Sequence, residues 1–231
     1  MADEQDTHGS LAGYQQALGQ EFGRLFYHCI SEWVDLSLTW QQYEQLFGHG
    51  PERVSMLNEA GAAFFGRVQR HFFDVVVLAI CRLSDPVKSR GKKNLTVNSF
   101  EDYMDTDERR NEMKKLLADI REKTQFHRDW RNRRIGHNDL DLRYGTAKPL
   151  ESATRNQMNE SITAIHQVFF YILGEFEDSH LVEEVIEPLD GPMVTLQLIY
   201  DARTLRAKEQ DGPYSVLQDR IASYPKWLMD Q

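Results

Sequence analysis

The sequence predicts an all-α protein: a helical bundle with long antiparallel helices and a small C-terminal extension. Apolar residues recur at alternating steps of three and four over long stretches, which is typical of helices that bury one stripe of their surface. Alternation of apolar and polar residues is too short to require a β-sheet, although residues 194–200 are ambiguous. We expect a flexible tail at 1–9, a helical domain at 10–178 and a partly helical extension at 179–231.

The first long helix should begin after Ser10 and end near Phe47. A serine at this place can accept a hydrogen bond from a main-chain N–H of the first helical turn. We interpret the aromatic residues of this helix as core rather than as a platform for stacking bases. The apolar seam comprises Phe22, Leu25, Cys29, Trp33, Leu36, Trp40, Tyr43 and Phe47.

The other predicted elements follow a break at residues 48–51, which contain two glycines and a proline. A short helix should span 52–59, and Gly61 should precede a helix that ends near 83. That helix is broadly apolar, so we expect it to be the most buried element. Residues 84–98 are rich in lysine, glycine and serine, which indicates an exposed basic loop. Further helices are predicted at 106–135 and 152–176, with an amphipathic stretch at 193–208.

The charge balance limits how the chain can contact nucleic acid. It has 27 Lys and Arg residues against 36 Asp and Glu, a formal net charge of −9. Proteins that coat long nucleic acids are usually basic, so any contact with RNA should be local. Basic residues gather at 88–93 and at 128–134, and for each group an ordinary solvated face is the alternative interpretation.

Several other classes of protein are disfavoured. Cys29 and Cys81 lie in apolar helical patterns without the spacing of a metal site. One Glu-x-x-His pair, Glu177 with His180, falls short of the two that a di-iron bundle needs. The acidic N-terminus does not resemble a signal peptide, and the longest apolar run, 75–81, is too short to span a bilayer. We expect a soluble, cytoplasmic protein without a metal or another cofactor.

Arg131, Asn132 and His137 are the candidate catalytic residues. An arginine can hold a phosphate through its planar fork of donors, and a histidine can transfer protons near neutral pH. On an unbroken helix, six steps of about 100° would point Arg131 and His137 roughly 120° apart. They can meet if the helix breaks at Gly136, since glycine adopts the left-handed conformation that ends helices, or if a second chain completes the site. The alternative is a surface arginine and a histidine at a helix end.

Arg121 and His127 have the same separation, and we interpret this second pair as a chance occurrence. No glycine or proline lies between them, and Glu122 would repel a phosphate. Replacing either residue by alanine should leave activity nearly unchanged.

Arg82 and Asp85 lie where the helix at 62–83 should end. We interpret them as a salt bridge that ties down the following loop, rather than as residues with a direct role in chemistry.

Several short motifs together suggest a family. They are Trp40-Gln41-Gln42-Tyr43 with Leu46-Phe47-Gly48, Phe64-Phe65, Arg82-Leu83-Ser84-Asp85-Pro86, Lys92-Lys93-Asn94-Leu95, and Trp130-Arg131-Asn132 leading to His137. In these motifs the chain resembles the HEPN superfamily of all-α nucleotide- and RNA-associated domains, in particular its abortive-infection branch of AbiU type. The resemblance covers roughly residues 20–175.

The resemblance implies a site. The family's signature is an arginine, usually followed by a polar residue, and then a histidine after four to six intervening residues, a pattern that Arg131, Asn132 and His137 fit. HEPN domains that are modified by a nucleotidyltransferase partner often carry a tyrosine two residues after the histidine. This chain has Asp139 there, which argues against that mode of regulation.

Two functional hypotheses follow. The first is a metal-independent endoribonuclease of the toxin or phage-defence type, whose composite site forms in a homodimer and for which an antitoxin is a candidate partner. The second is a non-catalytic helical module that binds a nucleotide, RNA or a partner protein. The expected RNA-binding residues are Arg128, Arg133, Arg134, Lys92 and Lys93, and the expected supporting residues are Arg82, Asp85, Trp130 and Asp139.

Overall fold

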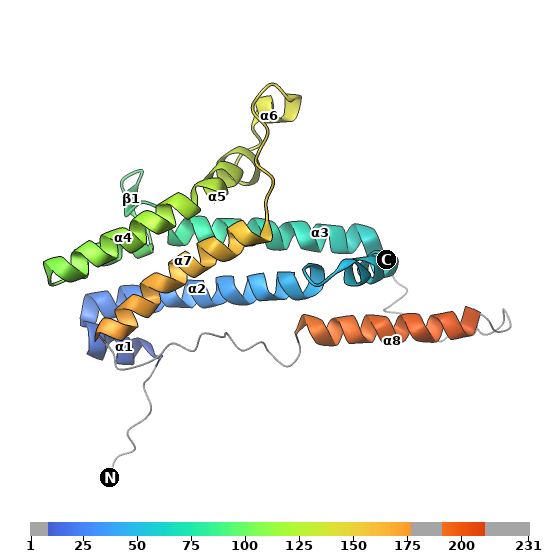
Figure 1. Cartoon of the computed structure of the whole chain (residues 1–231), viewed down its shortest axis with the longest axis horizontal. Helices are drawn as coiled ribbons and strands as arrows, with labels where there is room; N and C mark the ends of the chain where they lie inside the picture. The colour runs from blue at the N-terminus through green and yellow to red at the C-terminus, as the bar shows by residue number, and fades with distance from the viewer. Residues whose placement is uncertain (1–8, 177–190, 211–231) are drawn as a thin grey trace, which may run out of the picture. The chain divides into compact units, whose positions relative to one another are not determined.

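The computed structural model describes residues 9–176 and 191–210 of the chain. Figure 1 shows that these residues are almost entirely helical, which confirms the predicted all-α fold class. The helices are α1 (Leu11–Leu18), α2 (Gln20–Phe47), α3 (Pro51–Leu83), α4 (Asp107–Lys123), α5 (Gln125–Trp130), α6 (Leu140–Tyr144), α7 (Arg155–Phe176) and α8 (Pro192–Gln210). A 3₁₀-helix, η1 (Val97–Tyr103), a π-helix, η2 (Arg131–Ile135), and the short strands β1 (Lys88–Ser89) and β2 (Lys92–Lys93) complete the set.

The described residues belong to two compact units. Unit 1 comprises residues 1–41 and 70–186, and unit 2 comprises residues 42–69 and 187–231. The predicted tail at 1–9, except Gly9, and the predicted extension at 179–231, except 191–210, lie outside the described residues. The proposed boundaries at 10–178 and 179–231 stay a prediction.

The core of unit 1 is built around aromatic rings from α2, η1 and α7. Phe26, Phe100 and Phe169 are fully buried. Their ring centroids lie 5.8 Å (Phe26–Phe100), 5.6 Å (Phe26–Phe169) and 5.9 Å (Phe100–Phe169) apart. Aromatic pairs at such distances contribute about 0.5–1.5 kcal/mol beyond their buried area. The predicted seam of the first helix faces this core, with Phe22, Cys29, Trp33, Leu36 and Trp40 buried.

The first predicted helix is interrupted near its start. Ser10 caps α1 as expected, accepting a hydrogen bond from the Gly13 N–H at 3.1 Å. The chain then turns at Gly19, whose φ of 84° lies in the region that favours glycine. A Cβ on Gly23 would overlap the main chain at Tyr14, so this glycine allows α1 to lie directly against α2. The predicted continuous helix is therefore two helices, because Gly19 turns the chain and Gly23 allows the two to lie in contact.

The helix at 62–83 is less buried than predicted. Gly61 interrupts α3 with non-helical backbone angles, which confirms the predicted break. Val76 and Ile80 are fully buried, whereas Phe64 and Val75 are 64% and 49% exposed. Apolar composition alone does not tell which faces of a helix meet a partner, so the prediction that this is the most buried element is wrong.

The predicted helix at 106–135 consists of three pieces: α4, α5 and the π-helix η2. Thr124 separates the first two and is fully buried. A β-branched residue such as Thr124 is tolerated inside a helix, so the sequence does not predict a break at this position. The helix predicted at 152–176 is confirmed as α7, and the amphipathic stretch at 193–208 forms most of α8.

Unit 2 has a small core of its own. Leu46, Met56, Leu57 and Leu196 are buried there, with Phe47, Phe65 and Ile199 packed against them. An ion pair between Arg203 and Glu59, at 2.8 Å, joins α8 to α3 within this unit. The described part of the C-terminal extension therefore packs on the helical segment at 42–69.

His127 is a core residue of unit 1. It is fully buried, with Nε2 3.1 Å from the Met158 sulfur and Nδ1 3.4 Å from the Ser161 hydroxyl. Burial lowers the pKa of the imidazole from 6.5 to about 4, because the charged form would lose its hydration. The ring is neutral at pH 7 and is not available to a ligand at the surface.

Folding stability should therefore fall as the pH drops from 7 to 5. The unfolded chain takes up a proton at His127 near pH 6.5, whereas the folded chain takes it up only near pH 4, so acid favours the unfolded state between these values. For this difference in pKa, His127 should account for a loss of about 2 kcal/mol at pH 5. Urea denaturation at the two pH values measures the loss.

His127→Gln is the matched control, because glutamine is polar but does not titrate. Its free energy of unfolding should decrease by about 2 kcal/mol less than that of the wild type between pH 7 and pH 5. Equal pH dependence of the two proteins would contradict the assignment.

Candidate functional site

The candidate motif begins in a π-helix. The main-chain N–H of Gly136 donates to the Arg131 carbonyl oxygen at 2.7 Å, a bond across five residues that closes η2. Gly136 ends the helix as predicted, but with right-handed angles (φ −80°, ψ −28°) rather than the predicted left-handed ones. A Cβ on Gly136 would lie 3.1 Å from the Arg131 oxygen, so close approach is the physical reason for glycine here.

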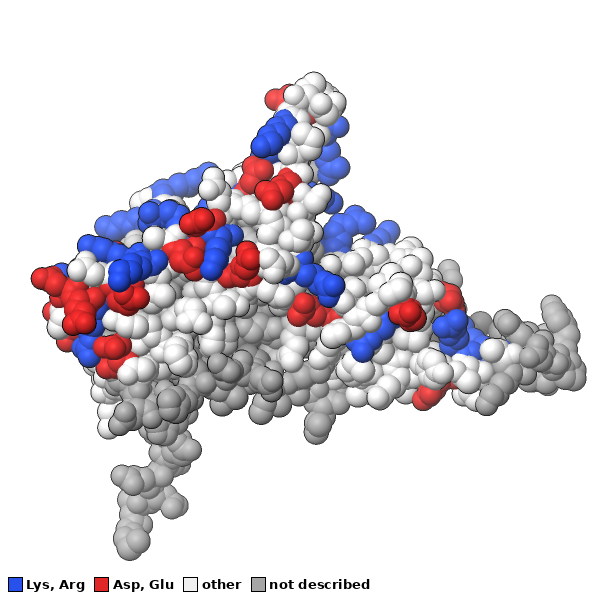
Figure 2. Space-filling view, in the orientation of Figure 1, with Lys and Arg blue, Asp and Glu red and all other residues white. Residues whose placement is uncertain are grey.

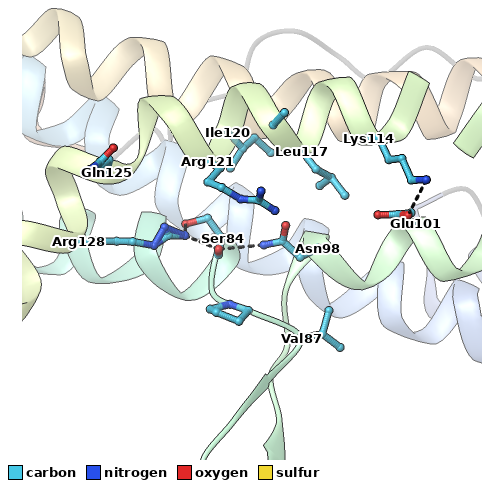
Figure 3. A pocket seen from close by; sticks show the side chains of 12 residues that line it. Ser84, Val87, Asn98, Glu101, Lys114, Leu117, Ile120, Arg121, Gln125 and Arg128 are labelled. Carbon is cyan, nitrogen blue, oxygen red and sulfur yellow. Dashed lines mark hydrogen bonds and ion pairs between the residues drawn. The ribbon is translucent and has the colours of Figure 1, made fainter. Parts of the chain in front are cut away.

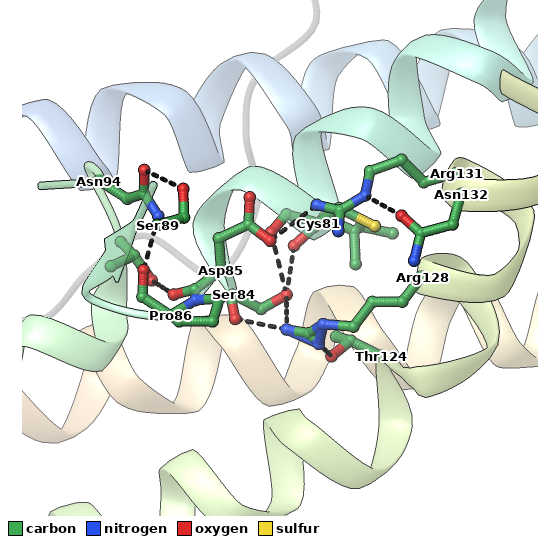
Figure 4. Close-up of polar contacts among 12 residues, drawn as sticks. Cys81, Ser84, Asp85, Pro86, Ser89, Asn94, Thr124, Arg128, Arg131 and Asn132 are labelled. Atoms are coloured by element: carbon green, nitrogen blue, oxygen red, sulfur yellow. Dashed lines mark hydrogen bonds and ion pairs between the residues drawn. The ribbon is translucent and has the colours of Figure 1, made fainter. Parts of the chain in front are cut away.

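The Arg131 guanidinium is held by two neighbours, as Figure 4 shows. Its Nη1 lies 2.7 Å from Oδ1 of Asp85, and its Nε donates to Oδ1 of Asn132 at 3.1 Å. The side chains of Arg131 and Asp85 are only 27% and 24% exposed. Screening by water is therefore weaker than for a surface pair, and the guanidinium has a defined orientation.

Asp85 and Arg82 do not pair with each other, so the predicted salt bridge between them is wrong. Arg82 instead bonds to Glu32 of α2 at 3.1 Å, in an exposed pair. Side chains at successive positions of a helix end point in different directions. The spacing of Arg82 and Asp85 in the sequence does not tell which of the two side chains faces η2. Asp85 is thus the residue that links the end of α3 to the candidate motif.

The chain around Asp85 is fixed by hydrogen bonds to carbonyl groups at 83–85. Thr96 Oγ1 donates to Leu83 O at 2.9 Å and to Asp85 O at 2.7 Å. Asn98 Nδ2 donates to the carbonyl oxygens of residues 84 and 85, at 2.9 and 3.0 Å. Sequence reasoning missed Thr96 and Asn98, because their partners lie 11 to 14 positions away and no short motif links them.

His137 lies apart from these bonds. It follows η2, its side chain is exposed, and within residues 9–176 and 191–210 it makes no hydrogen bond or ion pair. The structure thus joins Arg131, Asn132 and Asp85 directly, but adds His137 only as an exposed neighbour along the chain.

Two of the predicted RNA-binding arginines have structural partners instead. Arg128 Nη2 donates to the carbonyl oxygen of Ser84 and, at 3.0 Å, to its hydroxyl, while Nη1 donates to Thr124 Oγ1 at 3.3 Å. Arg133 bonds to Asp129 at 3.2 Å, to Asp139 at 3.4 Å and to the Lys148 carbonyl at 2.6 Å.

Trp130 anchors the motif. Its indole Nε1 donates to the Glu151 carbonyl at 2.9 Å, and its ring lies 4.9 Å from that of Phe73. The Arg134 guanidinium stacks over the same indole, 4.9 Å from the ring centre. These contacts fix the end of α5, from which η2 continues.

Asp139 caps α6. Its Oδ1 accepts from the main-chain N–H groups of Asp141 and Leu142, at 3.0 and 3.2 Å. The hydrogen bond from Leu142 is the main cause that lowers the pKa of this carboxyl, and the Arg133 guanidinium adds to it. Asp139 therefore fixes the chain that follows His137.

The remaining predicted contacts, Lys92 and Lys93, are exposed on β2. β1 and β2 form a hairpin whose turn places Arg90 and Gly91 at positive φ, 49° and 80°. Figure 2 shows Lys and Arg side chains gathered over this hairpin and the neighbouring part of α4. Among the predicted basic contacts, the lysines thus remain accessible to a ligand.

Other chemistry finds less support in this part of the molecule. Burial raises the pKa of the Cys81 thiol to about 11, so it is protonated at pH 7 and is a poor nucleophile. In the described residues, no three His, Cys, Asp or Glu side chains gather as a set of metal ligands.

Within residues 9–176 and 191–210, no helix combines the length and apolar character needed to cross a bilayer.

Comparison with known proteins gives one match. A HEPN family model, described as AbiU2, matches residues 19–190. No curated protein and no solved structure matches. The matched segment includes α2 to α7 and contains Asp85, Arg131 and His137.

Arg128→Ala should destabilise the fold, because Arg128 satisfies polar groups around the buried Ser84. A loss of about 1–3 kcal/mol in the free energy of unfolding is expected for groups left unpaired in this way. Arg134→Ala removes an exposed arginine from the same basic run, one that stacks on the Trp130 indole and satisfies no buried polar group, and should cost about 0.5–1 kcal/mol. Urea denaturation of both variants makes the comparison, and equal losses would contradict the structural role of Arg128.

Proposed function

The chain belongs to the AbiU2 family of HEPN proteins, and from this membership and the geometry of the site we propose that it is a metal-independent endoribonuclease. The observation that carries the proposal is the orientation of the Arg131 guanidinium by Asp85 and Asn132, at the start of the segment that presents an exposed His137. The site would serve a toxin or phage-defence protein.

Arg131 would bind the phosphate at the cut. Its Nη1 and Nε are engaged, but its Nη2 makes no hydrogen bond within the described residues. This nitrogen can donate to a phosphate oxygen and stabilise the charge that develops there. Asn132 uses its oxygen to accept from Arg131, which leaves its amide N–H groups to orient the scissile group.

His137 would transfer protons. The ribose 2′-oxygen attacks the adjacent phosphorus as the 2′-hydroxyl loses its proton to a general base, and the P–O5′ bond breaks as the leaving 5′-oxygen gains a proton from a general acid. His137 can serve in either role, since an imidazole exchanges protons near neutral pH. The products are a 2′,3′-cyclic phosphate and a free 5′-hydroxyl, and no metal is required for the balance.

We also propose that the site is completed in a homodimer. In the described chain no bond joins Arg131 to His137, and the family resemblance implies that two chains juxtapose their motifs. We further propose an antitoxin as a partner, which would cover the surface around Arg131 and His137.

A second candidate function is a non-catalytic module that binds a nucleotide, RNA or a partner protein. Its support is that Asp85 already neutralises Arg131, while Arg128 and Arg133 are committed to the fold. Such a module would bind through the same residues but would not depend on proton transfer by His137.

His137→Ala should reduce RNA cleavage by about two to four powers of ten, the usual contribution of general acid–base catalysis. Arg131→Lys should also lose most activity, because an ammonium cannot reproduce the planar contacts of a guanidinium. Cleavage of a defined single-stranded RNA, with analysis of the product ends, measures both effects. RNA with a 2′-deoxy residue at the cut should resist, and a chelator should not slow the reaction.

His49→Ala is the matched control, since His49 is also exposed, and it should cleave like the wild type. Inhibition by a chelator would contradict the metal-independent mechanism. Binding of RNA without cleavage, unaffected by His137→Ala, would favour the binding module.

Subunit mixing should test the composite site. Arg131→Ala and His137→Ala chains, co-expressed with different tags and purified as the mixed dimer, should regain a measurable part of wild-type activity, because one intact arginine and one intact histidine then meet across the interface. Each variant alone should stay inactive. Light scattering measures the oligomeric state.

Two outcomes would refute the composite site. One is a mixed dimer as inactive as its parents. The other is an active wild-type monomer at micromolar concentration.

A further inference from the structure

A groove in unit 1 lies beside the candidate site. It has a volume of about 860 Å³ and is bordered by α4, η1 and the segment that follows α3, as Figure 3 shows. Ser84 and Arg128 line one end of it. Ser84 precedes Asp85, the partner of Arg131, so the groove and the candidate site share one stretch of chain.

Two cations that line the groove have no ion pair among the described residues: Arg128, which is hydrogen-bonded to Ser84 and Thr124, and Arg121. Arg121 projects into the groove from α4, is exposed, and forms no ion pair or hydrogen bond in the part of the chain that the structure describes. The carboxylate that lines the groove, Glu101, lies toward the other end and is paired with Lys114 at 3.6 Å. The end near Arg121 is therefore suited to an anion such as a phosphate.

The groove also offers one fixed acceptor and an apolar wall. Asn98 Nδ2 is held by the carbonyl oxygens of Ser84 and Asp85, so its Oδ1 faces away from them and is left to accept from a ligand. Leu117 and Val87 supply apolar surface beside it. A phosphate, a base edge with N–H donors and the face of a base would each find a complement here.

We propose that this groove binds one nucleotide of single-stranded RNA next to the cleaved bond, with its phosphate at Arg121 and its base against Leu117 and Asn98. The inference rests on the proposed function, because it places the neighbouring phosphate at Arg131. Arg121 would then bind substrate, so the expectation that Arg121→Ala leaves activity nearly unchanged would hold for kcat but not for KM.

The hairpin next to the groove favours a polyanion over a neutral ligand. Lys88 lies directly opposite Lys93 in the register of β1 and β2. Like charges in this arrangement destabilise a pair of strands. Both lysines are exposed, and the hairpin follows Val87 in the wall of the groove. A strand that leaves the groove past this hairpin would relieve the repulsion.

Binding is measured by fluorescence anisotropy with a short labelled single-stranded RNA, in full-length His137→Ala protein so that the probe is not cut. Adding Arg121→Ala should weaken binding about tenfold and make the salt dependence shallower by about 0.7, the value for one phosphate contact on a single strand. Ala118→Phe, which fills the groove without changing charge, should also weaken binding. Arg24→Ala, an exposed arginine of α2, is the matched control and should have no effect.

In otherwise wild-type protein, Arg121→Ala should raise KM and leave kcat unchanged. Normal RNA affinity and normal KM in both groove variants, in a protein whose cleavage depends on His137, would overturn the groove and leave the nuclease standing. Weakened RNA binding in both groove variants, with no cleavage that depends on His137, would support the groove and overturn the nuclease. A nucleoside monophosphate that binds as tightly as the RNA would overturn the assignment to an RNA strand.

Discussion

The candidate site depends on one constraint: the main-chain carbonyl groups at the C-terminal end of α3 must be hydrogen-bonded by side chains. The last carbonyl groups of a helix have no partner within it, and here water cannot replace one because Ser84 and Thr96 are buried. Three side chains from later elements donate to the chain at 83–85: Thr96, Asn98 and Arg128. Because this end of the helix is fixed, the Asp85 carboxylate has a defined position, and so has the Arg131 guanidinium that it binds.

The pairing with Asp85 also decides how the site can attract RNA. A paired guanidinium exerts a weak field at long range, and the chain carries a formal net charge of −9. Affinity for nucleic acid from counterion release would then be small. Recognition would depend on donor geometry at Arg131 and on the exposed cations that have no carboxylate partner nearby. This fits an enzyme that selects a local feature of its substrate better than a protein that coats long RNA.

The fold class could be predicted because it follows from a short-range pattern: the spacing of apolar residues from Phe22 to Trp40 identifies the face that is buried. Arg131 and His137 could be chosen as candidates because they fit the signature of the family that the chain resembles. The sequence does not predict which basic side chains bond within the fold and which are available to a ligand. Arg128 and Arg133 lie in the same basic run as Arg131, yet they bond to groups up to 44 positions away. The tertiary structure makes the distinction: Arg128 bonds to Ser84 after α3, and Arg133 bonds to residues on either side of η2.

The π-helix η2 accounts for the different environments of Arg131 and His137. A π-helical turn is rare and is frequently found at functional sites. Here it inserts an extra residue between Arg131 and the end of the helix, and Gly136 allows the close approach that its hydrogen bond requires. The chain then leaves the helix, so Arg131 turns back to Asp85 while His137 stays exposed. Within one chain the cation is thus fixed and the histidine is left open to a second subunit or to RNA.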